Sequence, residues 1–155
     1  MNISTRGRYG LRALLEVASV SKNGPVTIKD ISKKQKMSVT YLEQIFHKLK
    51  NAGILKSIRG PKGGYILGKD HDKITVREII DVLDGPISIS YCDYPKLREK
   101  SCTGPKTCVS RILWKKLEDN IEKILSNVTL ADLEKQAKEI SFKKNTHVSR
   151  DRRKK

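Results

Sequence analysis

The stretch MSVTYLEQIFHKLKNAG, residues 37–53, decides the fold of this chain. Ser38 is a favoured helix N-cap residue, and Gly53 is typical of the position just after a helix. Between them, apolar residues recur at the i, i+3, i+4, i+7 spacing of one helical face: Leu42, Ile45, Phe46 and Leu49. We therefore expect a helix here with one buried face and one exposed face.

The face opposite this apolar stripe is expected to be exposed. It carries Thr40, Tyr41, Glu43, Gln44, His47, Lys48, Lys50 and Asn51. Such a face combines side chains that can read base edges with side chains that contact phosphates. From exposure and charge, we interpret Tyr41, Lys48 and Lys50 as phosphate contacts.

A shorter helix precedes this one. Thr27 and Asp30 have the spacing of a capping box. Ile28 and Ile31 supply the apolar side of the short helix, and a tight joint follows at residues 35–37. The two helices predict a helix-turn-helix, whose second helix enters the major groove of DNA. By itself, this pair also fits an ordinary small helical protein.

The segment after the second helix strengthens the DNA-binding interpretation. Residues 54–59 and 65–67 have the pattern of two strands, and the turn GPKGG at 60–64 joins them. This hairpin is a predicted wing with Arg59 and Lys62 at its tip, and Lys62 is a further expected phosphate contact. Glycine adds little to a core and costs chain entropy, so a cationic glycine-rich hairpin is unusual for packing alone.

Composition limits the class of protein. The chain has 155 residues and a mass of 17.6 kDa, enough for one domain with an extension. Its formal net charge of +16 indicates an anionic partner and strongly salt-dependent binding. No apolar stretch is long enough to span a bilayer, and the first residues do not lead into a signal-peptide apolar run. We expect a cytoplasmic protein without a membrane partner.

Two further capped helices complete the first part of the chain. Ser4 or Thr5 can cap a helix whose expected buried stripe is Leu11, Leu14, Leu15 and Ala18. Thr75 and Glu78 have capping-box spacing before another amphipathic helix. We assign residues 1–85 to a winged helix-turn-helix DNA-binding domain.

The next segment, residues 86–105, is interpreted as a cysteine-containing sensor loop, because helical periodicity fails there. The three cysteines are Cys92, Cys102 and Cys108. Basic neighbours favour thiolate over thiol, and we place Cys108 in the first turn of the following helix, where the helix dipole acts likewise. Thiolates suit soft metals, so metal binding or redox chemistry is expected.

A long helix follows, within a predicted dimerisation segment at residues 106–140. Its apolar stripe consists of Val109, Leu113, Leu117, Ile121, Ile124, Leu125 and Val128. The winged domain is too small to cover this stripe, so we expect it to pack against a second copy. Thr129 and Asp132 cap a short final helix, and residues 141–155 are expected to form a disordered basic tail. The fold class is mainly α, a winged helix-turn-helix domain with a long C-terminal dimerisation helix.

These features resemble one family. The stretch SVTYLEQIF at 38–46, the wing RGPKGGYILGKD at 59–70 and three cysteines before a helix containing Leu113 and Trp114 are similar to the IscR-like regulators. The resemblance covers roughly residues 1–137. It implies a homodimeric bacterial winged-helix transcription regulator that binds a palindromic operator in double-stranded DNA and carries an iron–sulfur cluster of 2Fe–2S or 4Fe–4S type.

The resemblance also implies roles for particular residues. Thr40, Glu43 and Gln44 become base readers in the major groove, and Arg59 becomes the wing residue in the minor groove. The three cysteines become cluster ligands. The fourth ligand is open, because the family's histidine three residues after the last cysteine is replaced by Arg111. Candidates are Asp93 or Glu99, a group from the other subunit, or a small exogenous molecule. A replaceable fourth ligand would suit a labile sensor.

Other functions fit parts of the sequence. The cysteines would also serve a DNA-binding regulator with a zinc site or a thiol-redox switch. An electron-transfer protein has no use for a cationic wing, whereas an RNA-binding winged helix would use the same charge. We expect no enzyme, because His47, His71 and His147 are scattered singly and are interpreted as surface residues. A regulator that represses by blocking a promoter is the favoured outcome.

Overall fold

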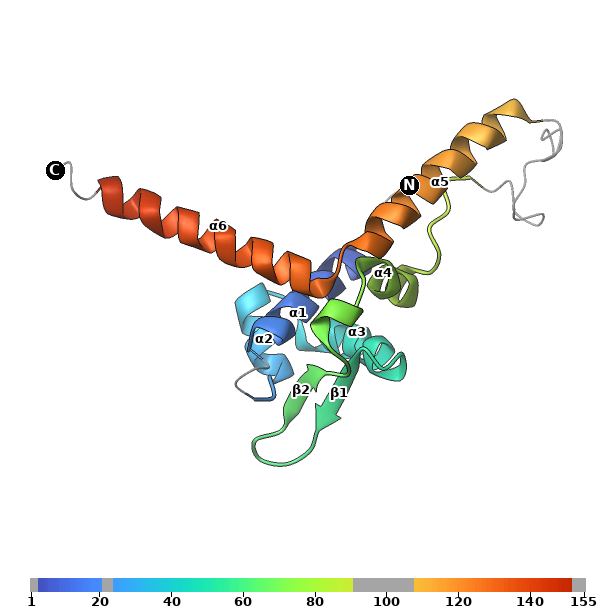
Figure 1. Ribbon diagram of the computed structural model, residues 1–155. Helices are drawn as coiled ribbons and strands as arrows, with labels where there is room; N and C mark the ends of the chain where they lie inside the picture. Colours follow the sequence, from blue (N-terminus) through green and yellow to red (C-terminus); the bar gives the residue numbers. More distant parts are fainter. Residues whose placement is uncertain (1–2, 21–23, 91–107, 152–155) are drawn as a thin grey trace.

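The structure, a computed structural model, describes residues 3–20, 24–90 and 108–151, with side chains described up to Ser141 (Figure 1). Helices dominate, as predicted. The elements in chain order are α1 (Thr5–Val20), α2 (Ile28–Gln35), α3 (Val39–Asn51), β1 (Leu55–Ile58), β2 (Gly64–Leu67), the 3₁₀ helix η2 (His71–Lys73), α4 (Val76–Asp84), α5 (Val109–Asn127) and α6 (Leu130–Asp151).

The predicted N-caps account for the starts of three helices. Thr27, Ser38 and Thr75 each accept a hydrogen bond on the side-chain oxygen from the backbone N–H three residues later, at 3.2, 3.2 and 3.1 Å. Each bond satisfies an N–H that the helix itself leaves unpaired. Between α2 and α3, Lys36 adopts the left-handed conformation that turns the chain. The predicted helix-turn-helix is therefore confirmed.

The core lies between α1, α3 and α4, and α3 buries its predicted apolar face completely. The expected stripe of α1 is partly wrong, because Leu11 and Leu15 are only half-buried. The helix instead approaches α4 through its glycines: a Cβ on Gly10 would lie only 2.1 Å from Leu83 Cδ1. A search for large apolar residues does not detect such a close approach.

The wing is an antiparallel hairpin in which Leu55 pairs with Leu67 and Ile58 pairs with Gly64. A bridge that the sequence did not predict extends it. The backbone of Val26, just before α2, exchanges hydrogen bonds of 2.9 and 2.8 Å with Tyr65. The wing is thus joined to the start of the helix-turn-helix.

Helices α5 and α6 project from one joint, on the side of the molecule away from the wing (Figure 1). The joint is bonded to the start of α4: Leu130 N–H donates to Ile74 O at 2.8 Å, and Val76 N–H donates to Val128 O at 2.9 Å. Leu130 is fully buried in the core. In the part of the chain that was described, no helix is long and apolar enough to cross a membrane.

Three predictions about the C-terminal part are wrong. The final helix is not short, and the backbone of residues 141–151 is helical rather than disordered, because α6 runs to Asp151. No glycine or proline occurs after Asn127, so nothing in the sequence breaks the helix. The first turn of α5 begins at Val109, so Cys108 is its N-cap residue and not part of that turn.

Candidate nucleic-acid interface and cysteine site

The candidate DNA-reading surface is the outer face of α3. Five of its predicted contact residues are exposed there because the opposite face is buried in the core: Thr40, Glu43, Gln44, Lys48 and Lys50. The first three lie at i, i+3 and i+4, so they share one face of the helix. Their hydroxyl, carboxylate and amide groups offer the donors and acceptors that base edges in a major groove require.

Tyr41 differs from the expectation of an exposed residue. It is half-buried, and its ring meets that of Tyr9 on α1 edge to face, with centroids 6.1 Å apart. Aromatic pairs of this geometry contribute about 0.5–1.5 kcal/mol beyond their burial. Packing thus accounts for the Tyr41 ring, and its phosphate contact stays a prediction.

The wing turn presents cations at the other end of this surface. Arg59 and Lys62 are both exposed. The turn closes through a hydrogen bond of 2.9 Å from Gly63 N–H to Gly60 O. A Cβ on Gly63 would lie 2.3 Å from Ile58 O, so glycine is required for the chain to turn this tightly. One exposed lysine that sequence reasoning missed, Lys36, lies in the turn before α3.

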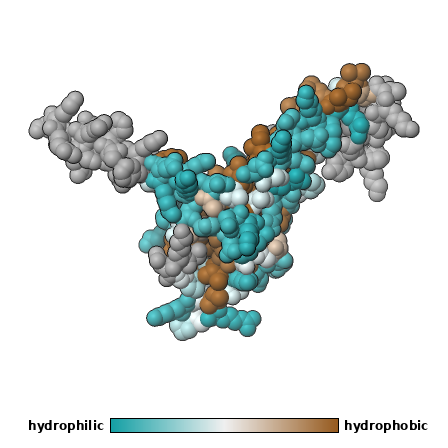
Figure 2. All heavy atoms as spheres, viewed as in Figure 1, coloured by the Kyte–Doolittle hydropathy of each residue, from teal (hydrophilic) through white to brown (hydrophobic). Residues whose placement is uncertain are grey.

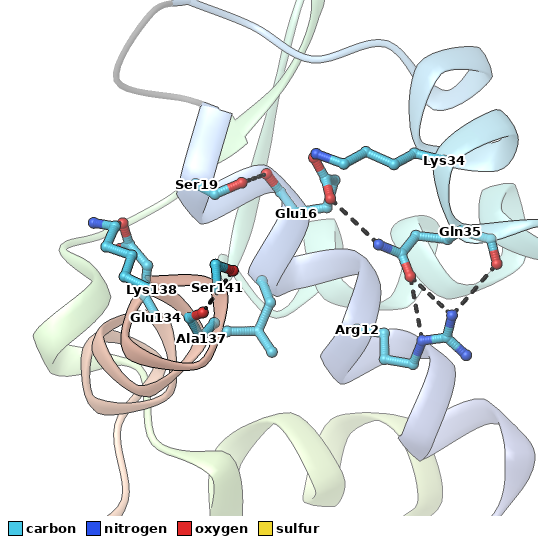
Figure 3. Close-up of a pocket in the computed structure, with 10 residues that line it drawn as sticks. Arg12, Glu16, Ser19, Lys34, Gln35, Glu134, Ala137, Lys138 and Ser141 are labelled. Atoms are coloured by element: carbon cyan, nitrogen blue, oxygen red, sulfur yellow. Dashed lines mark hydrogen bonds and ion pairs between the residues drawn. The ribbon is translucent and has the colours of Figure 1, made fainter. Parts of the chain in front are cut away.

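A polar network fixes α2, and with it the helix-turn-helix, against α1 (Figure 3). Buried Glu16 accepts from Lys34 Nζ and, at 3.3 Å, from Gln35 Nε2. Gln35 Oε1 accepts from Arg12 Nη2 at 3.0 Å. These residues line a groove of about 590 Å³ between α1, α2 and the first turns of α6. None of the predicted site residues lies in that groove, and we interpret the network as structural.

Among the three cysteines, Cys108 lies within the described residues, whereas Cys92 and Cys102 lie outside them. Cys108 is partly exposed at the N-terminus of α5, and its Sγ is 3.1 Å from Ser110 Oγ. Hydrogen bonds from the Ser110 hydroxyl and the Arg111 backbone N–H lower the pKa of the Cys108 thiol. A thiolate is the form that binds zinc or an iron–sulfur cluster, so Cys108 fits either group.

The outer side of α5 exposes four residues of the predicted apolar stripe, Val109, Leu113, Leu117 and Ile124, whereas Ile121, Leu125 and Val128 are half-buried. Val109, Ile112 and Ile124 are 81%, 72% and 62% exposed. Figure 2 shows apolar residues gathered along the projecting helix. Ile112 was not part of the predicted stripe and extends it. A continuous apolar surface of this kind is rare on a monomer and marks an interaction surface.

An ion pair attaches the inner side of α5 to α4. Arg77 on α4 pairs with Glu122 on α5 at 3.1 Å and with Asp81 on its own helix at 2.7 Å. The neighbouring carboxylates raise the pKa of Arg77, led by the hydrogen bond to Asp81. The ion pair with Glu122 joins the second half of α5 to α4, which packs against α1 and α3.

The histidines do not form a catalytic group among the described residues. His47 is exposed, as predicted. The interpretation of His71 as a simple surface residue is wrong, because its Nδ1 lies 3.3 Å from buried Glu134 and so links η2 to α6. The side chain of His147 lies outside the described residues.

A helix-turn-helix followed by a β-hairpin wing, with a polar helix face and cations at the wing tip, defines a winged helix-turn-helix DNA-binding protein. Comparison with known sequences specifies the family. The chain belongs to the Rrf2 family, described as iron-dependent transcriptional regulators, whose sequence pattern matches residues 3–136.

Individual relatives agree with this assignment. The HTH-type transcriptional regulator IscR of Escherichia coli strain K12 / DH10B is 38% identical over 149 residues, which cover 95% of this chain and 90% of IscR. The structure of CymR, the global cysteine regulator of B. subtilis, is 40% identical with a TM-score of 0.74, covering 88% of this chain and 98% of CymR. T. potens IscR is 36% identical with a TM-score of 0.73, covering 90% of each chain.

Proposed function

We propose that this transcription regulator is a cytoplasmic bacterial homodimer that binds a palindromic operator and represses by blocking a promoter. The observation that carries the proposal is the exposed polar face of α3 beside the cationic wing. In this arrangement Thr40, Glu43 and Gln44 read bases in the major groove, and Arg59 enters the minor groove. Phosphate contacts come from Tyr41, Lys48, Lys50 and Lys62.

The exposed stripe of α5 supports the homodimer. Two copies that bury these stripes against each other would remove the apolar surface from water, and twofold symmetry then relates the two α3 helices. A symmetric pair of recognition helices matches a palindromic DNA site. The dimer geometry therefore sets the spacing of the half-sites.

We propose further that an iron–sulfur cluster held by Cys92, Cys102 and Cys108 modulates DNA binding. The lowered pKa of the Cys108 thiol and the similarity to IscR support this. A cluster supplies a redox-responsive and labile group whose presence reports iron and sulfur supply. The alternative is a zinc site or thiol switch, which the same lowered thiol pKa favours, and the similarity to a cysteine regulator keeps this alternative in view.

The α4–α5 contact supports a route from the cysteines to DNA. Cys108 begins α5, and Glu122 on the same helix pairs with Arg77 on α4. A change around Cys108 that shifts α5 would thus shift α4 and the recognition helix packed on it. Small displacements suffice, because the two recognition helices must fit successive major grooves at once.

The proposal of DNA binding is tested by selecting binding sites from a pool of random DNA duplexes with the purified protein. A palindromic consensus whose binding is lost on Arg59→Ala and Gln44→Ala substitution is the expected result. Equal binding to all duplexes, or a preference for structured RNA, would contradict the proposal.

The proposal of a bound iron–sulfur cluster is tested separately. Anaerobic absorption spectra with iron and sulfide assays compare the wild type with Cys92→Ala, Cys102→Ala and Cys108→Ala. A brown protein that loses its colour in the variants supports the cluster. A colourless protein without iron supports the zinc or thiol alternative.

A further inference from the structure

Helix α5 buries a glutamate while it exposes its large apolar side chains. Of the residues of α5, all of which are described, only Glu118 is buried, and it is 7% exposed. Removing a carboxylate from water is unfavourable unless hydrogen bonds replace the lost hydration. Packing alone would therefore favour an apolar residue at this position.

Two backbone N–H donors from one short segment face this carboxylate. Glu118 Oε1 accepts hydrogen bonds from the backbone N–H of Ile89 at 2.6 Å and of Ser90 at 3.4 Å. The Ser88 hydroxyl, which donates to the Ser90 carbonyl oxygen at 2.7 Å, lies 3.4 Å from the same carboxylate oxygen. Because backbone N–H groups occupy fixed places along the chain, these bonds fix residues 88–90 at one level of the helix, which an apolar contact would not do.

This attachment encloses all three cysteines in the chain, because residues 88–90 precede Cys92 and Glu118 follows Cys108. Ser90 is two residues before Cys92, so extended chain between them spans at most about 7 Å. Cys108 is the N-cap residue of the helix on which Glu118 lies, ten residues further on and thus about 15 Å along the axis. The carboxylate holds the segment that leads to Cys92 on the same helix that carries Cys108.

We propose that Glu118 is a positioning residue for the cysteine site, which sets where Cys92 lies relative to Cys108 by holding residues 88–90 on α5. The inference rests on the proposed function, since it assumes that the cysteines share one bound group. Glu118 does not touch that group. It acts through the backbone, and a carboxamide, which keeps an acceptor oxygen, retains most of its effect.

The test compares the full-length protein with Glu118→Ala, Glu118→Gln and the control Asp119→Asn, which alters an exposed acid on the same helix that pairs with Lys115. Hydrogen exchange, read by mass spectrometry over residues 86–95, measures the attachment. Iron and sulfide per chain after anaerobic reconstitution measure its consequence. Circular dichroism and DNA binding of the metal-free protein check that each variant is folded.

We expect Glu118→Ala to speed exchange at residues 89 and 90 at least tenfold and to lower iron per chain at least twofold. Glu118→Gln should stay within threefold of wild type in exchange and keep its iron, and Asp119→Asn should match wild type. A folded Glu118→Ala protein with unchanged exchange or full iron content would overturn the inference. A wild-type protein without iron would instead contradict the proposed cluster, and the exchange rates would still decide whether Glu118 holds residues 88–90.

Discussion

The rings of Phe46 on α3 and Tyr65 on β2 meet edge to face, with their centroids 4.9 Å apart and their planes at 76°. Phe46 is fully buried, and the backbone of Tyr65 is paired with Val26. This contact ties the wing to the inner face of the helix proposed to read DNA. The side chains of Arg59 and Gln44 are thereby presented on one connected scaffold.

Replacing Phe46 by leucine should weaken this connection. The substitution keeps an apolar side chain but removes the ring pair, and we expect the free energy of unfolding to fall by about 1–2 kcal/mol, measured by urea denaturation. Tyr65→Phe keeps both rings and should change the free energy of unfolding by less than about 0.5 kcal/mol. Equal losses in the two variants would argue against a role for the ring contact.

Gly64→Ala should separate the wing from the start of α2. An added Cβ would lie 2.6 Å from the carbonyl oxygen of Val26, so the bridge between Val26 and Tyr65 must open or shift. We expect a loss of about 2 kcal/mol in thermal unfolding. Ser57→Ala, at an exposed position of β1, is the control and should leave stability unchanged. A Gly64→Ala protein as stable as this control would contradict the packing argument.

Base readers and phosphate contacts should respond differently to alanine. Gln44→Ala is expected to cost about 1–3 kcal/mol on the selected operator and to relax the preference at one base pair, because its amide reads a base edge. Lys48→Ala should weaken binding to all duplexes alike and reduce the slope of log affinity against log salt by about 1. Fluorescence anisotropy at several salt concentrations measures both. The same salt slope for Lys48→Ala and wild type would remove Lys48 from the interface.

A charge in the exposed stripe of α5 should prevent dimer formation. Ile112→Asp places a carboxylate where the proposed partner surface would exclude water, and we expect a monomer in sedimentation equilibrium. Lys123→Asp, at an exposed polar position of the same helix, should leave the dimer intact. A dimeric Ile112→Asp protein would move the dimer interface elsewhere.

The thiol of Cys108 should ionise at a lower pH than a free cysteine. Hydrogen bonds from the Ser110 side chain and the Arg111 backbone lower its pKa, so the thiolate forms at a lower pH than in a free thiol, which ionises near about 8.5. In a Cys92→Ser, Cys102→Ser background, the pH midpoint of alkylation should therefore lie below that value. Ser110→Ala removes the largest cause and should raise the midpoint. An unchanged midpoint in Ser110→Ala would contradict the assigned cause.

Local features of the fold could be predicted because their physical causes are local. Thr27, Ser38 and Thr75 cap helices by bonding to an N–H three residues away. Capping-box spacing predicts Thr27 and Thr75, and the residue type before an amphipathic pattern predicts Ser38. The buried face of α3 followed from its periodicity. The exposed positions of Glu43 and Gln44 then followed, because a helix that buries one side presents the other.

Long-range features could not be predicted, because each depends on a single residue that belongs to no repeating pattern and whose partner lies far away in the sequence. The Val26–Tyr65 bridge involves single residues without a strand pattern. Tyr41 is half-buried because Tyr9, from another helix, lies beside it. Glu118 has the periodicity of an ordinary surface acid, and its burial depends on backbone groups far away in the sequence.

Leu130 completes the core of the winged domain, although it follows α5 in the chain. The core of the DNA-binding domain is therefore closed by a residue that lies more than forty positions after the end of α4. Closing so long a loop is thermodynamically tolerable, because doubling the length of a loop costs only about 0.6 kcal/mol in closure entropy. A chain cut after α4 would lack part of its core, so the recognition helix depends for its stability on the segment that follows the cysteines.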